Sequence, residues 1–165
     1  MKSKIHKLHR QSIVVVCKRL FIAVILFITV TGTYANPLSG KEGPDFNGAD
    51  HFRRQFPQAT EVSYKVKGQI TEVSFIWNGL RLESFYDQQG NPLATARIID
   101  RNSLPVNIQL SVQNYNPDGV VTSAIEFTDS NEGLSYYVTV AGPKSTYLLH
   151  VSTSGDISVF KKMKH

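Results

Sequence analysis

The feature that most constrains this chain is a recurring order of patterns, in which a short helical stretch precedes four segments of alternating apolar and polar residues. Alternation with a period of two is typical of β-strands that bury one face. Gly, Pro and Asn, which favour turns, separate the segments. The order occurs twice after residue 48, so we predict an α+β fold with an antiparallel sheet packed against helices.

Each half of this pattern predicts a defined set of elements. In the first half, a helix over residues 49–56 ends at Pro57, because the residue before a proline disfavours helical backbone. Four strands follow, over residues 62–67, 71–77, 80–86 and 92–99. In the second half, a helix over residues 104–115 precedes strands over residues 120–128, 134–141, 145–152 and 156–161.

Two short turns fix the expected register of the first strands. Asn78-Gly79 is a strong hairpin signal, because both residues tolerate positive φ. If Lys67-Gly68 forms a second two-residue turn, Tyr64 faces Thr71. One face of the sheet then carries the apolar residues that we expect to pack on the helix, namely Val62, Tyr64, Val66, Val73, Phe75, Trp77, Leu80, Leu82 and Tyr86.

The second half predicts a similar division between core and surface. The helix is expected to bury Val106, Leu110 and Val112 along one side. The strands are expected to bury Val121, Ile125, Phe127, Tyr136, Val138 and Val140. Thr122, Glu126, Tyr137 and Thr139 would then face away from this core.

The first 35 residues have the pattern of a secretory signal peptide. A lead with six Lys and Arg residues precedes the apolar run 20–30 and the small-residue site Thr33-Tyr34-Ala35. The alternative is a membrane anchor, but the run has 11 residues, whereas a spanning helix needs roughly 20. We therefore expect 1–35 to be a signal peptide, 36–48 a flexible lead and 49–165 a domain exported to the periplasm or the medium, without a stable membrane anchor.

Removal of this leader changes the charge of the chain. The whole sequence has 18 Lys and Arg residues, and the part after residue 35 keeps 12 of them against 13 Asp and Glu residues. The net charge then falls from +5 to about −1, which argues against a nucleic-acid partner. Cys17 is the only cysteine and lies in the leader, so the exported domain needs no disulfide.

The remaining residues give little sign of catalysis. After residue 35 the chain has no thiol and no Gly-x-Ser-x-Gly motif. Its histidines, His51, His150 and His165, lack the close spacing typical of a metal site. Residues 129–133 offer oxygen ligands but not the further carboxylate of a calcium loop, so we interpret them as a polar hairpin connection. We expect no enzyme activity, no metal and no cofactor.

The segment Phe56-Pro57-Gln58-Ala59-Thr60-Glu61-Val62-Ser63-Tyr64 resembles the opening motif of PepSY-like proteins, which are bacterial exported domains similar to β-lactamase inhibitor protein. The resemblance continues through Asn78-Gly79, residues 83–87, Gly90 and Leu104-Pro105, although Tyr64 stands where the family usually has Trp. It implies a tandem repeat of two helix-plus-four-strand units, about 49–100 and 104–163, and a location in the envelope or medium. No inhibitory residue matches by motif.

Binding is the function that the pattern favours most. The sheet face opposite the helices is predicted to be open and polar, with isolated apolar residues that could anchor a partner. We expect this face to recognise an unknown protein or peptide of the envelope or medium through Ile76, Phe85 and Tyr137. Restraint of an envelope enzyme is one role for such a module.

Two other classes of function give different expectations. A carrier or sensor of small ligands or lipids would have a cavity between helices and sheet, and ligand would change the fluorescence of Trp77. A hydrolase would need three polar residues to converge in a cleft, and no motif indicates that they do.

Overall fold

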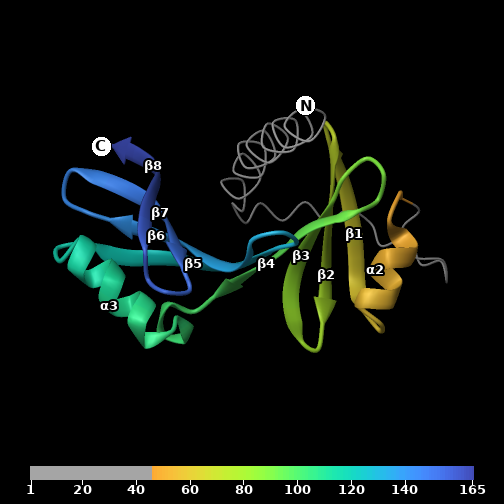
Figure 1. Cartoon of the computed structure of the whole chain (residues 1–165), viewed down its shortest axis with the longest axis horizontal. Helices are drawn as coiled ribbons and strands as arrows, with labels where there is room; N and C mark the ends of the chain where they lie inside the picture. Colours follow the sequence, from red (N-terminus) through yellow and green to blue (C-terminus); the bar gives the residue numbers. More distant parts are fainter. Residues whose placement is uncertain (1–45) are drawn as a thin grey trace, which may run out of the picture. The chain divides into compact units, whose positions relative to one another are not determined.

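The computed structural model describes residues 46–165, all within the compact unit Pro37–His165. The predicted signal peptide and the flexible lead up to residue 45 lie outside the described residues. Figure 1 shows the elements in chain order. They are α2 (Ala49–Gln55), β1 (Thr60–Lys67), β2 (Ile70–Trp77), β3 (Leu80–Tyr86), β4 (Pro92–Ile99), the 3-10 helix η1 (Arg101–Ser103), α3 (Val106–Tyr115), β5 (Val120–Asp129), β6 (Gly133–Ala141), β7 (Ser145–Ser152) and β8 (Ile157–Lys164).

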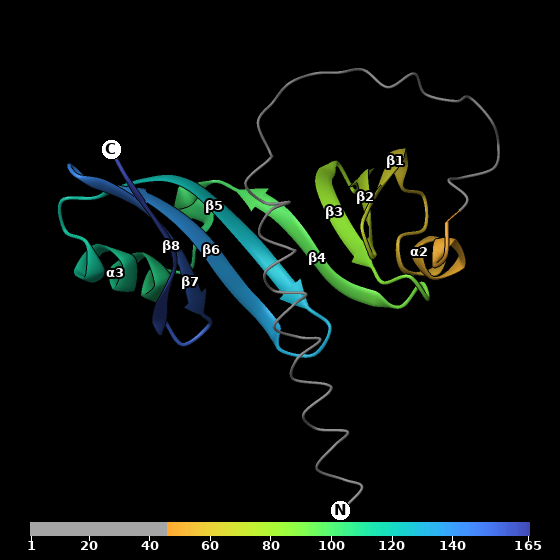
Figure 2. The ribbon, with the colours of Figure 1, turned by 90° about the horizontal axis from the view of Figure 1, so that it is seen from above.

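The strands form one antiparallel sheet, which confirms the predicted α+β fold with an antiparallel sheet. Its eight strands lie in the order β1 to β8, so each strand pairs with the one that precedes it in the chain. Strands β4 and β5 pair directly, from Ala94 with Asp129 to Ile99 with Ala124, and the sheet is therefore continuous across both halves. Figure 2 shows β4 and β5 side by side, with α3 on one side of the second half.

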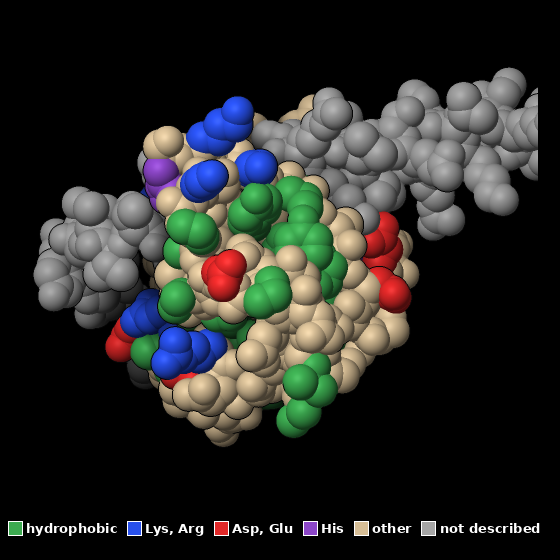
Figure 3. Space-filling view, turned by 90° about the vertical axis from the view of Figure 1, so that its left-hand side faces the viewer, with side chains coloured by type: hydrophobic (Ala, Val, Ile, Leu, Met, Phe, Trp, Pro, Cys, Tyr) green, Lys and Arg blue, Asp and Glu red, His purple; other side chains and the backbone are tan. Residues whose placement is uncertain are grey.

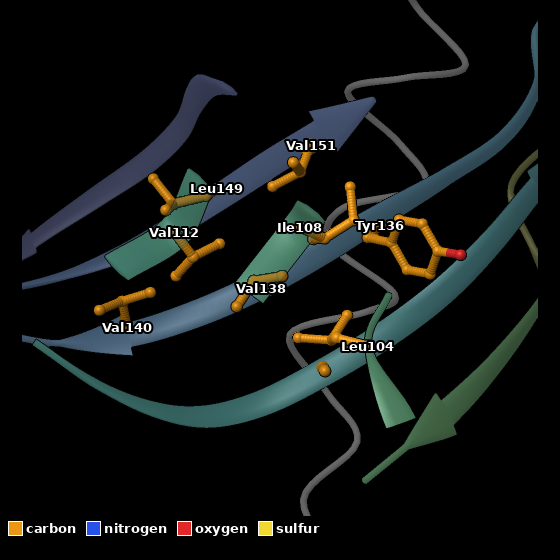
Figure 4. Close-up of a cluster of buried hydrophobic side chains, with 9 residues drawn as sticks. Leu104, Ile108, Val112, Tyr136, Val138, Val140, Leu149 and Val151 are labelled. Carbon is orange, nitrogen blue, oxygen red and sulfur yellow. The ribbon is translucent and has the colours of Figure 1, made fainter. Parts of the chain in front are cut away.

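Both helices lie on the same face of the sheet, where each covers its own core. In the first core, Phe52 and Phe56 from α2 pack on Phe75 of β2, with ring centroids 4.9 and 4.6 Å apart. In the second core, Ile108 and Val112 from α3 point toward β6 and β7 (Figure 4). Each buried apolar side chain contributes about 1.5–3 kcal/mol, so these two clusters hold the helices on the sheet.

The buried side of α3 differs from the prediction. Val106 and Leu110 are 71% and 54% exposed, whereas Ile108 is fully buried. Ile108 and Val112 are four residues apart and lie on one stripe of the helix surface, and Leu104, just before the helix, packs in the same cluster. The prediction was wrong for Val106 and Leu110 because α3 turns the side that carries Ile108 and Val112 toward the sheet.

The register of β1 also differs from the prediction. Tyr64 pairs with Val73 rather than Thr71, because the turn is Gly68-Gln69 and Lys67 pairs with Ile70. Tyr64 is 43% exposed and Val66 66% exposed, although both were expected in the core. The reason is that β1 is the edge strand, so these side chains have a neighbouring strand on one side only.

A β-bulge in β5 reverses the expected faces of its apolar residues. The pairing shifts between Val121 and Ser123, and a single extra residue exchanges the two faces of a strand. Ile125 and Phe127 therefore lie opposite α3, while Ala124 packs in its core. Glu126 is on the helix side, where both of its carboxylate oxygens accept hydrogen bonds from Arg97, at 2.8 and 3.1 Å.

Candidate functional site

The candidate site is the sheet face opposite α2 and α3, which we call the helix-free face. Strand pairing places its residues in rows that cross the strands. One row runs Phe85, Ala94, Asp129 across β3, β4 and β5, and the next runs Glu83, Ala96, Phe127. A third row runs Ile98, Ile125, Tyr137 and His150 from β4 to β7. Within residues 46–165, no helix lies on this face.

The three predicted binding residues all lie on the helix-free face, but the structure does not bring them together. Ile76 is on β2, Phe85 on β3 and Tyr137 on β6. Strand spacing puts β2 and β6 about 19 Å apart, so a partner would have to contact Ile76 and Tyr137 separately. Their role in binding stays a prediction.

The expected exposure of two of these residues is wrong. Phe85 and Tyr137 are 0% and 5% exposed, and Ile76 is half-buried. The ring of Tyr137 packs on those of Phe127, His150 and Phe160, and Phe85 lies between its cross-strand neighbours Glu72 and Ala94. Ile98 also lies on the helix-free face, is 58% exposed and was not predicted as a site residue.

An aromatic group centred on Tyr137 occupies the second half of the helix-free face. Its ring lies 5.5 Å from Phe127, in an edge-to-face arrangement, 5.0 Å from His150 and 5.7 Å from Phe160. Such pairs are a favoured packing of aromatic rings. The sequence pattern missed Phe127 as part of this group, because alternation alone does not indicate the bulge in β5.

Carboxylates border the apolar residues of the helix-free face. Burial raises the pKa of Glu83, nearby Glu72 raises it further, and Lys67 lowers it. The Nζ atom of Lys67 lies 2.6 Å from Glu72. Burial, followed by the charges of Glu132 and Asp129, raises the pKa of Tyr137 to about 12. The helix-free face therefore has buried aromatic side chains at its centre and negatively charged carboxylates beside them.

The turn after β5 agrees with the polar hairpin connection that the sequence predicts. Asp129 Oδ1 accepts hydrogen bonds from the backbone N–H groups of Asn131 and Glu132, at 2.7 and 3.0 Å. The turn joins β5 to β6, where Asp129 pairs with Gly133. Between residues 46 and 165, no three His, Cys, Asp or Glu side chains lie close enough together to hold a metal ion.

A second hollow lies on the other side of the sheet, between α3 and the start of β5. It is an open groove of about 350 Å³. Arg101, Gln109, Gln113 and Asn116 give it polar atoms, and Val112 and Val120 give it apolar surface. The Nε2 atom of Gln109 donates to the carbonyl of Leu104 at 2.7 Å. The groove lies between helix and sheet, where the small-ligand alternative places its cavity.

The outer side of α3 is a further apolar surface. Val106 and Leu110 are exposed there, and Val159 is exposed on β8. Figure 3, which views the end of the molecule with α3 and the last strands, shows hydrophobic side chains gathered between groups of Lys and Arg. None of the described helices has the length and apolar character that a transmembrane span requires.

Comparison with known proteins identifies the fold. No protein-family model matches the sequence, and no curated protein matches it significantly. A BLIP-like protein from Bacteroides fragilis matches in structure with a TM-score of 0.65 and 23% identity, over 76% of this chain and 91% of that one. A DUF2874 family protein from Bacteroides uniformis matches with a TM-score of 0.64 and 12% identity, over 73% and 89% of the two chains.

A third structure agrees with these two. It comes from Bacteroides eggerthii, is provisionally described as periplasmic, and matches with a TM-score of 0.63 and 13% identity, over 74% of this chain and 89% of that one. The fold is thus the one found in BLIP-like and DUF2874 proteins, which confirms at the level of fold the resemblance to β-lactamase-inhibitor-like proteins. Because the sequence identity to these three proteins is 23% or lower, the structural likeness shows a common fold only.

Proposed function

We propose that this chain is an exported, non-catalytic binding module that recognises a protein or peptide through the helix-free face of its sheet. In this proposal Ile76, Phe85 and Tyr137 belong to the contact surface, and Ile98 is its exposed apolar residue. An enzyme of the cell envelope is the first class of target to test. Export is supported by the leader pattern in residues 1–35 and by the likeness to a structure provisionally described as periplasmic.

The observation that carries the proposal is the composition of the helix-free face. Phe85, Phe127 and Tyr137 lie there beside alanines and carboxylates, on a sheet whose other face is already packed on two helices. Aromatic residues are enriched where proteins bind one another, and they carry much of the binding energy. These three rings are buried, so in this proposal they support a preformed surface on which a partner would meet Ile98 and the half-buried Ile76.

Affinity capture from the envelope fraction of the producing cells tests the proposal. The bait is the purified protein, and the test variant carries Ile76→Glu and Ile98→Glu, which add charge to the helix-free face. The matched control is Leu110→Glu, because Leu110 is 54% exposed, close to the 58% of Ile98, but lies on the outer side of α3. Thermal unfolding of each bait establishes that it is folded.

A protein retained by the wild type and the Leu110→Glu control, but lost with the double variant, would support the proposal. We expect this result because a buried, unpaired carboxylate at an interface costs several kcal/mol. A partner that is lost only with Leu110→Glu would show that the binding surface lies on the outer side of α3 and not on the helix-free face. A partner retained by all baits would rule out both surfaces.

The groove beside α3 supports the alternative, a carrier or sensor of small ligands. Its polar lining favours a small polar ligand over a lipid. Trp77 is a poor reporter for it, because Trp77 packs on Phe56 in the first core, 5.6 Å between ring centroids. Recovery of no protein by any bait, together with a rise in Tm on addition of a small molecule, would favour this alternative.

The division of the chain into repeats is also a proposal. We infer two units, about residues 49–100 and 104–163, related as a tandem repeat. The element order supports this division, because each of α2 and α3 precedes four strands. Superposition of the two units tests it, since unrelated halves would not align helix and strands together.

A further inference from the structure

We propose that the groove beside α3 binds the C-terminal end of an extended peptide, whose carboxylate is held by Arg101 and whose main chain pairs with the free edge of β5. The groove lies between α3 and the start of β5, on the side of the sheet that carries the helices. Because it is not on the helix-free face, this inference goes beyond the proposed function and does not depend on it.

The first residues of β5 have a neighbouring strand on one side only. On that side β5 pairs with β6 along its whole length. On the other side β4 ends where Ile99 pairs with Ala124, so residues 120–123 have no strand beside them within the described part of the chain. Such an edge presents unpaired N–H and C=O groups to a chain that lies along it. Val120 and Val121 line the groove, so the edge opens into it.

A stripe of amide side chains on α3 forms the opposite wall of the groove. Gln109, Gln113 and Asn116 follow one another at intervals of four and three residues, so they lie on one side of the helix. The stripe is about 10 Å long, and four residues of a strand span about 13 Å, so the two walls have similar lengths. Amide groups both donate and accept hydrogen bonds, as a peptide main chain does. A short extended peptide therefore meets complementary groups on both walls.

Arg101 stands at the end of the groove where β4 stops. It follows β4 by two residues and is the one charged residue among the described residues that line the groove. Its side chain is exposed and forms no ion pair with any residue from 46 to 165. The neighbouring Asp100 is already bonded, since its Oδ1 accepts from the backbone N–H of Asn102 at 2.7 Å. A guanidinium group binds a carboxylate through two parallel hydrogen bonds, so this end of the groove favours a carboxylate.

The position of Arg101 also sets the direction of the peptide. Because Ile99 pairs with Ala124, Arg101 stands near the Ser123 end of the free edge. A peptide that runs parallel to β5 brings its C-terminal carboxylate to Arg101, whereas the opposite direction would bring its N-terminal ammonium to a like charge. The volume of the groove, about 350 Å³, is at the lower end of the range for small-ligand sites, which suits the end of a chain better than a folded partner.

NMR titration of the isotope-labelled protein with the peptide acetyl-Thr-Val-Thr-Val tests the proposal. The peptide is used as the free acid and as the C-terminal amide, which lacks the negative charge. We expect the free acid to shift the backbone amide signals of residues 120–123 and the side-chain amide signals of Gln113 and Asn116. It should bind about tenfold more tightly than the amide, since hydrogen bonds between charged groups are stronger than neutral ones. Arg101→Gln should remove that preference, and Gln113→Trp should weaken both peptides by filling the groove.

The matched control is Arg54→Gln, because Arg54 is exposed on α2 and its loss should leave the preference unchanged. Equal binding of the acid and the amide, or a preference that persists in Arg101→Gln, would overturn the inference. Acetate that binds as tightly as the free acid would also overturn it, since only a carboxylate would then be recognised. So would signal shifts that do not saturate at millimolar peptide or that lie outside the groove. Circular dichroism of each variant separates lost binding from lost folding.

Discussion

At the scale of single residues, two glycines allow the start of α2 to lie directly on the turn between β3 and β4. Gly48 has φ of +104° and Gly90 has φ of +82°, both in the region that favours glycine. A Cβ on Gly48 would lie 2.8 Å from the carbonyl oxygen of Gly90, and a Cβ on Gly90 would overlap the backbone of Gly48. Asn47 Nδ2 donates to the carbonyl of Gln88 at 2.9 Å beside this contact.

Gly90→Ala should therefore reduce the free energy of unfolding by about 2–4 kcal/mol, through left-handed backbone strain and steric overlap together. The control is Gly79→Ala, at φ of +76° with no atom within 4 Å of the added Cβ, where strain alone acts. This control should lose about 1–2 kcal/mol. Urea denaturation measures both, and equal losses would show that the Gly48–Gly90 contact is not tight.

Single residues also show what the sequence could predict about the site. The sequence predicts that Ile76, Phe85 and Tyr137 lie on the helix-free face, because the turns determine which alternate residues of each strand share a face. Their burial could not be predicted, because alternation indicates which face of a strand a residue occupies but not what packs on that face.

At the scale of elements, the two apolar sides of α3 have different roles. Ile108 is fully buried against β6 and β7, whereas Leu110, two residues later, is 54% exposed. Ile108→Ala should cost about 2–5 kcal/mol, because it leaves a cavity in the core. Leu110→Ala should change stability by about 0.5 kcal/mol or less. If chemical denaturation gave the reverse order, the orientation of α3 described here would be wrong.

The elements also show why sequence patterns succeed and fail. The bounds of β3, β4 and β7 match the prediction, since Gly, Pro, Asn and Asp mark their ends. The register of β1 did not match because its turn is Gly68-Gln69, and the faces of β5 did not match because that strand contains a bulge. A bulge changes the parity of a strand without changing its composition, so alternation cannot reveal it.

At the scale of the whole molecule, buried tyrosines link stability to alkaline pH. The pKa of Tyr137 is raised from 10.0 to about 12, chiefly by burial, and burial also raises the pKa of Tyr86 and of Tyr136. In the unfolded chain these hydroxyls lose their protons near pH 10, whereas in the folded chain they keep them to higher pH. The folded state then binds more protons, so stability falls as pH rises from about 10 to 12.

Urea unfolding at a series of pH values measures this fall, and the ultraviolet absorbance of tyrosinate follows the ionisation itself. Tyr137→Phe should make the fall shallower, because it removes the tyrosine with the most strongly raised pKa. The control is Tyr64→Phe, since Tyr64 is 43% exposed on the edge strand. Identical pH profiles for the wild type and Tyr137→Phe would contradict the assigned burial of Tyr137.

The order of strands in the sheet has a consequence for how the chain folds. Because each strand pairs with its predecessor, every pairing step closes a short loop, and the entropy lost in closing a loop grows slowly with its length. The longest closure is between β4 and β5, across η1 and α3. Local pairing of this kind gives a low contact order, which is associated with rapid folding. If the chain emerges from a pore with its N-terminus first, each strand could pair with its predecessor before the C-terminal residues have emerged.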